Sequence, residues 1–86
     1  MKRYNIVFSK RAEKDIQKLS ARVVEKIIPE IIALADNPRP IGCKKLKGYT
    51  DLWRIKIGDY RVIYSVEDVI LLVDIREVGN RKDIYR

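Results

Sequence analysis

The sequence contains no histidine, a single cysteine (Cys43) and no long hydrophobic run. Without histidine, the protein has no imidazole to serve as a general base, a member of a catalytic triad or a metal ligand. One cysteine excludes an internal disulfide, and no apolar run reaches the ~20 residues that span a membrane. The first residues also lack the apolar region of a signal peptide. We therefore expect a protein of the reducing cytoplasm that uses no metal, no cofactor and no membrane.

Positive charge is in clear excess. The 86 residues include 19 Lys and Arg against 12 Asp and Glu, which gives a formal net charge of +7. Such a charge points to an anionic partner, with nucleic acid the first choice, although a basic surface without a partner is the simpler alternative. The short length leaves room for only one hydrophobic core, so we expect a single domain over residues 1–86.

The hydrophobic pattern predicts one strand, two helices and then three strands. Ser9 and Ser20 are suited to cap the helices, and Pro38 should end the second one. The expected ranges are a strand at 3–8, helices at 10–19 and 22–37, a loop at 41–49, and strands at 52–57, 60–66 and 69–78. This order predicts an α+β fold, in which the two N-terminal helices pack on a mostly antiparallel four-stranded sheet.

The apolar stripe of the second helix is wider than one sheet contact needs, because it covers about half of the circumference. It is formed by Val23, Val24, Ile27, Ile28, Ile31, Ile32, Leu34 and Ala35. The extra width favours a helix that also contacts a neighbour, either the first helix or a partner chain.

The dipeptide Gly58-Asp59 predicts a hairpin with a two-residue turn. In that register one face carries an apolar wall of Trp53, Ile55, Ile57, Tyr60, Val62 and Tyr64. The other face carries Arg54, Lys56 and Arg61, with Lys56 directly opposite Arg61. Because facing cations destabilise a strand pair, this arrangement favours a bound anion. A solvated face is the alternative, and a two-residue turn at 67–68 would offer another, an ion pair between Arg61 and Asp74.

Two further groups of residues can contribute to binding. Lys44, Lys45 and Lys47 lie together in the expected loop, where they either bind an RNA backbone or simply keep the loop soluble. Arg81 and Tyr85 follow the last expected strand, where they either join the site or belong to a frayed end.

Three stretches resemble the RelE/ParE toxin superfamily: FSKRAEKDIQKL near the start, the hairpin WRIKIGDYRVIY and the terminal VGNRKDIY. The resemblance extends over essentially the whole chain. It implies the fold derived above and a toxin of a type II toxin–antitoxin system that cleaves messenger RNA in the ribosomal decoding site. The implied partners are a cognate antitoxin, which holds the toxin inactive, and the ribosome with its messenger RNA.

The resemblance also implies the active site, which combines Arg54, Lys56 and Arg61 of the hairpin with Arg81 and Tyr85 of the terminal motif. Attack by the 2′-hydroxyl needs a base, cations for the developing charge and an acid. Because there is no histidine and neighbouring cations favour a neutral amine, we expect Lys56 to be the base. Arg61 would clamp the phosphate, Arg54 orient it, Arg81 stabilise charge or donate a proton, and Tyr85 stack on a base or assist proton transfer.

Two other functions stay open. Members of the ParE branch inhibit DNA gyrase and cut no RNA, although the terminal Arg81 and Tyr85 are typical of the nuclease branch. A basic RNA-binding module without catalysis is the second alternative. It stays open because RelE-like enzymes often have lysine where Arg54 stands, and many relatives have histidine where Asn80 stands.

Overall fold

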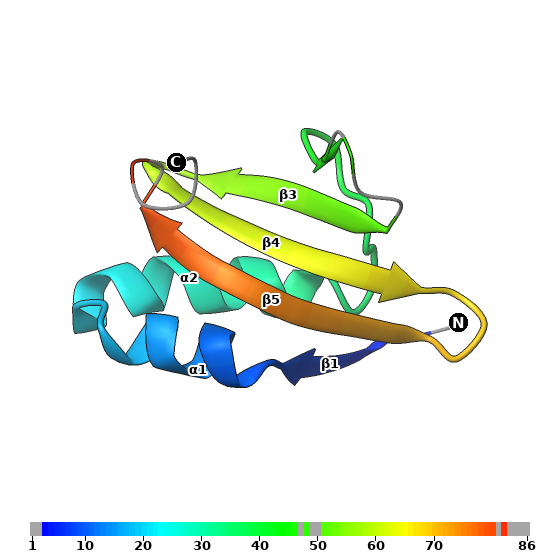
Figure 1. The fold of residues 1–86 in the computed structure, drawn as a ribbon, viewed down its shortest axis with the longest axis horizontal. Coiled ribbons are helices and arrows are strands. Elements are labelled where there is room, and N and C mark those ends of the chain that lie inside the picture. Colours follow the sequence, from blue (N-terminus) through cyan, green and yellow to red (C-terminus); the bar gives the residue numbers. More distant parts are fainter. Residues whose placement is uncertain (1–2, 47, 49–50, 81, 83–86) are drawn as a thin grey trace.

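The computed structural model describes residues 3–46, 48, 51–80 and 82. In this part of the chain, two helices pack against one face of a five-stranded mixed sheet (Figure 1). The elements are β1 (Asn5–Phe8), α1 (Lys10–Gln17), α2 (Ala21–Ala33), β2 (Lys44–Lys45), β3 (Leu52–Ile57), β4 (Tyr60–Glu67) and β5 (Leu72–Asn80). The α+β class is confirmed, and the sheet contains one strand more than predicted because β2 lies within the expected loop.

The strands lie in the order β1-β5-β4-β3-β2. Strand β1 runs parallel to β5, and the other three neighbouring pairs are antiparallel. The mostly antiparallel sheet is therefore as predicted. Strand β4 occupies the centre, so that side chains of β3 and β5 flank it on both sides.

Both helices begin at the predicted serine caps. The hydroxyl oxygens of Ser9 and Ser20 each accept a hydrogen bond from the backbone N–H three residues further on, at 3.1 and 3.3 Å. Helix α2 ends at Ala33, earlier than predicted, because the chain tightens into i→i−3 hydrogen bonds from Leu34 to Ile31 and from Ala35 to Ile32 (both 3.0 Å). Leu34 and Ala35 stay buried in this tighter turn.

The core lies between the helices and the sheet. Its buried members are Ala12, Ile27, Ile31 and Leu34 on the helix side, and Ile55, Val62, Tyr64, Val66, Val73, Ile75 and Val78 on the sheet side. The wide stripe of α2 is only partly used in this core, because Ile32 is 54% exposed. No helix in the described part of the chain has the length and apolar character needed to cross a membrane.

The loop after α2 is tied to the sheet at the end of the molecule where β4 turns into β5. The hydroxyl of Tyr64, which is fully buried, donates a hydrogen bond of 2.7 Å to the Pro38 carbonyl. Arg39 forms a bidentate pair with Asp68 (2.9 and 3.1 Å) and lies over the Trp53 ring, 5.0 Å from its centroid. These contacts fix the start of the segment that continues into β2.

Helix α1 holds the second half of β5, which extends beyond its pairing with β1. The carboxylate of Asp15 accepts a hydrogen bond of 3.1 Å from the backbone N–H of Val78. A free donor on the edge of the sheet is satisfied in this way, and the end of β5 that approaches the candidate site is kept in place.

Candidate active site

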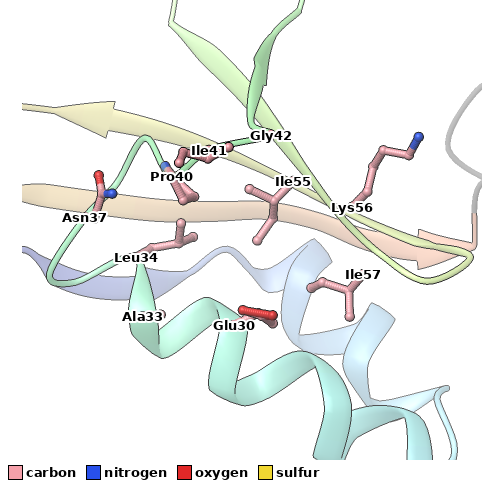
Figure 2. Close-up of a pocket in the computed structure, with 10 residues that line it drawn as sticks. All are labelled: Glu30, Ala33, Leu34, Asn37, Pro40, Ile41, Gly42, Ile55, Lys56 and Ile57. Carbon is pink, nitrogen blue, oxygen red and sulfur yellow. The ribbon is translucent and has the colours of Figure 1, made fainter.

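The hairpin of β3 and β4 has the predicted register. Ile57 pairs with Tyr60 on either side of the Gly58-Asp59 turn, and Lys56 pairs with Arg61 one position further along. Gly58 has a φ of +61°, which suits the first position of a type II′ turn. The predicted apolar wall is also confirmed, since its six side chains all belong to the core or pack against it. Figure 2 shows Ile55 and Ile57 pointing toward the helices and Lys56 pointing away from them.

The helix-free face of the sheet carries the three predicted hairpin cations. Lys56 is exposed, Arg54 is half-buried and Arg61 is only 5% exposed. The low exposure of Arg61 argues against the alternative of a solvated face, in which all three cations would be open to solvent. Arg61 lies in the central strand, and its Nη1 donates a hydrogen bond of 3.3 Å to the Tyr60 carbonyl, so its long side chain lies over the sheet.

Arg61 does not lie opposite Asp74, so the alternative ion pair is wrong. The connection between β4 and β5 runs through four residues, 68–71, and a bulge shifts the pairing near Ile63. Arg61 consequently pairs with Gly79, which has no side chain. Asp74 instead binds Arg76 at 2.8 Å.

The lysines of the expected loop are separated by the structure. Lys44 and Lys45 form the short strand β2, so the prediction of a loop over 41–49 is wrong at these two positions. Lys44 pairs with Arg54 and shares its helix-free face, whereas Lys45 pairs with Trp53, which packs against the core on the other face. Lys47 lies outside the described residues.

Arg81 and Tyr85 also lie outside the described residues, so their predicted roles stay predictions. Strand β5 ends at Asn80, which pairs with Tyr60 at the start of β4. The side chain of Asn80 accepts a hydrogen bond of 3.0 Å from the backbone N–H of Lys82. The end of β5 therefore lies beside the same part of β4 that carries Arg61.

Among the described residues, the largest pKa shifts lie away from these cations, at two side chains that hold the loop after α2. Hydrogen bonds from Arg39 and Tyr4 lower the pKa of Asp68 to about 2. Burial raises the pKa of the Tyr64 hydroxyl well above its usual range. The hydroxyl therefore stays protonated at any ordinary pH and donates its hydrogen bond to the Pro38 carbonyl. Both groups stabilise the scaffold.

A pocket of about 480 Å³ lies between the end of α2, the loop after it and β3 (Figure 2). Most of its lining is apolar, formed by Ala33, Leu34, Pro40, Ile41, Gly42, Ile55 and Ile57, with Glu30, Asn37 and Lys56 as its polar members. Ile41 is fully exposed at its rim. Sequence reasoning missed this pocket because its walls meet only in the folded chain; the excess apolar width of α2 was the one indication of it.

Comparison with known proteins identifies the relatives of the chain. The family described as ParE toxin of the type II toxin–antitoxin system parDE matches residues 6–85. The mRNA interferase toxin RelE of Escherichia coli K12 is 33% identical over 81 residues, which span 92% of this chain and 84% of that protein.

Solved structures agree with this relationship. The intact E. coli RelBE toxin–antitoxin complex contains a chain with a TM-score of 0.79 and 32% identity, over 90% of this chain and 95% of that one. The archaeal RelE–RelB complex of Pyrococcus horikoshii gives a TM-score of 0.79 and 30% identity, over 91% and 94% of the two chains.

Proposed function

The chain belongs to the ParE/RelE toxin family, and we propose that it is the toxin of a type II toxin–antitoxin system and cleaves messenger RNA on the ribosome. One observation supports this function above all. Lys56 and Arg61 face each other on the helix-free side of the sheet, with Arg54 on the same face. Such a concentration of positive charge fits the phosphate of an RNA backbone.

In the proposed reaction, the 2′-hydroxyl of a nucleotide attacks the adjacent phosphorus. The 2′-oxygen forms a bond to phosphorus while the bond to the 5′-oxygen of the next nucleotide breaks. One proton leaves the attacking hydroxyl and another reaches the leaving oxygen, so the products are a 2′,3′-cyclic phosphate and a free 5′-hydroxyl. No metal is required if side chains transfer both protons and neutralise the phosphate.

Lys56 is proposed as the base that takes the proton of the 2′-hydroxyl. The chain contains no histidine, and the positive charges of Arg54 and Arg61 nearby favour the neutral form of an amine. Arg61 would bind the phosphate oxygens and Arg54 would orient them. From the sequence motif, Arg81 would stabilise the developing charge or donate a proton, and Tyr85 would stack on a base or assist proton transfer.

The ribosome is proposed to present the messenger, while the remaining basic residues bind RNA backbone. Lys45 and Lys47 are assigned to this wider contact, which would be largely independent of sequence. With a net charge of +7, the chain is suited to approach a ribosomal surface rich in phosphate.

An antitoxin is the proposed protein partner, and the pocket beside α2 is its proposed binding site. The relatives of known structure include RelE chains in complex with RelB antitoxins. The pocket offers apolar walls, an exposed Ile41 at its rim and the cation Lys56. An amphipathic segment with apolar anchors and acidic residues would fit this lining.

Purified toxin added to translating ribosomes tests the proposed function. Mapping of the messenger ends should show cuts within the ribosome-bound region, with 2′,3′-cyclic phosphate termini, and the cuts should persist when a chelator is added at a level that keeps the ribosomes intact. Intact messenger together with gyrase-dependent DNA damage in expressing cells would instead favour the ParE-type function. Binding of RNA without cuts or DNA damage would favour a non-catalytic module.

A further inference from the structure

Strand β2 brings a further cation, Lys44, to the face that carries Arg54, Lys56 and Arg61. Lys44 pairs directly with Arg54, and residues paired across neighbouring strands point to the same side of a sheet. Three strands thus contribute two pairs of cations to the helix-free face, Lys44 with Arg54 and Lys56 with Arg61.

The two pairs are separated by a distance that suits consecutive phosphates. Arg54 and Lys56 are two residues apart on β3, so their Cα atoms are about 7 Å apart along the strand. Lys44 lies one strand further out, at about 5 Å from Arg54 across the sheet. These steps are close to the separation of neighbouring phosphates in an extended RNA strand.

The row of paired residues that contains Lys44 and Arg54 changes from positive to negative charge across the sheet. Arg54 pairs with Ile63 of β4, and Ile63 pairs with Glu77 of β5, so the row begins with Lys44 at the β2 edge and ends with a carboxylate. Glu77 has its nearest described cation, Arg11, at 4.0 Å. An RNA backbone would be attracted along β3 toward the β2 edge and repelled from β5 in this row.

We infer that Lys44 forms a second phosphate subsite beside Arg54 and binds a phosphate next to the one that is cleaved between Lys56 and Arg61. Arg54, which orients the cleaved phosphate, then lies between the two subsites. The messenger strand then crosses the helix-free face from β4 toward β2. This subsite rests on the proposed function, because it takes the Lys56–Arg61 pair as the place of cleavage. Lys45, the neighbour of Lys44 in the chain, lies on the other face and takes no part in the subsite.

Replacing one messenger phosphate by a neutral methylphosphonate tests the subsite. Ribosomes are programmed with messengers that carry this group at the phosphate on the 5′ side or on the 3′ side of the cleaved bond. For the wild-type protein, one of the two positions should slow single-turnover cleavage roughly 10-fold or more, as expected for a lost hydrogen bond between charged groups. Lys44→Ala should slow cleavage of the normal messenger by a similar factor.

The decisive measurement is the coupling between the two changes. If Lys44 binds that phosphate, Lys44→Ala should be nearly insensitive to the methylphosphonate, because the interaction is already lost. Lys45→Ala is the matched control, since it removes the same charge from the neighbouring exposed position on the opposite face; it should keep the full wild-type sensitivity. Thermal unfolding of both variants would check that they remain folded.

Two results would overturn the inference, and they are distinguishable. Wild-type cleavage together with equal methylphosphonate sensitivity in Lys44→Ala and Lys45→Ala would refute the subsite and leave the proposed function intact. A wild-type protein that leaves the normal messenger uncut on the ribosome would refute the proposed function, and the subsite with it.

Discussion

Lys56→Arg separates a lysine that takes a proton from one that only supplies charge. Lys56 is exposed on β3, faces Arg61 and points away from the helices (Figure 2), so a longer cation can be accommodated there without repacking the core. We therefore expect Lys56→Arg to fold normally and to bind ribosomes as well as the wild-type protein. Cleavage should nevertheless fail, because arginine is a very poor base.

The size of the loss follows from the acidity of the two side-chain types. Arginine holds its proton about 2–3 pKa units more tightly than lysine, so the neutral fraction at a given pH falls about 10²–10³-fold. General base catalysis by one group usually contributes ~10²–10⁴-fold to a rate. Both considerations predict that Lys56→Arg loses ~10²-fold or more in the cleavage step.

Single-turnover cleavage on programmed ribosomes, with toxin in saturating excess, measures this step apart from binding. Lys26→Arg provides a matched control, because it makes the same substitution at an exposed position of α2, on the opposite side of the sheet. Cleavage by Lys56→Arg at a rate close to the wild-type rate would refute Lys56 as the base and make Tyr85 the next candidate. Loss of wild-type cleavage on addition of chelator, with ribosomes intact, would refute the metal-free mechanism.

Three further predictions concern the site and its scaffold. Arg61→Ala should remove most toxicity in a growth assay and, because Arg61 is 5% exposed, should also cost about 1–3 kcal/mol in urea unfolding; full toxicity would contradict its role at the site. Tyr64→Phe should lower the free energy of unfolding by about 1–3 kcal/mol, because the Pro38 carbonyl loses a buried donor; an unchanged urea midpoint would contradict this. The pKa of Asp68 is lowered from 3.8 to about 2, so its contribution to stability should be complete above pH 3.8 and disappear as the pH falls toward 2. Asp68→Asn should therefore flatten the pH dependence of unfolding in this window, which an identical acid limb in both proteins would exclude.

The hairpin was predictable because its signals are local. Gly58 permits the positive φ of a tight turn, and alternation fixes which side chains share a face once the turn is known. The next connection lacks such a signal. Its turn contains no glycine, and Leu71 adopts a φ of +53°, a conformation that an apolar residue rarely takes. The four-residue connection and the bulge therefore could not be derived, and the register of Arg61 against β5 was open until the fold was known.

The position of Lys44 could not be predicted for a different reason. A strand of two residues is too short to show alternation, and it exists because the preceding loop is anchored to the sheet by Tyr64 and Arg39. The burial of Arg61 likewise depends on the strand order, which places it in the centre of the sheet. Both features are consequences of tertiary contacts, whereas the charges themselves are visible in the sequence.

Under the proposed function, Lys56 connects inhibition with catalysis. It lines the apolar pocket beside α2 and also faces Arg61 on the helix-free side of the sheet. A partner seated in that pocket reaches Lys56 from the open edge of β3, since β2 pairs with β3 only at residues 53 and 54. An acidic group of the partner placed there would hold Lys56 in its charged form, in which an amine cannot accept a proton. Blocking Lys56 would then be sufficient for inhibition. Lys44 and Arg54 would not have to be covered by the antitoxin in the inactive complex.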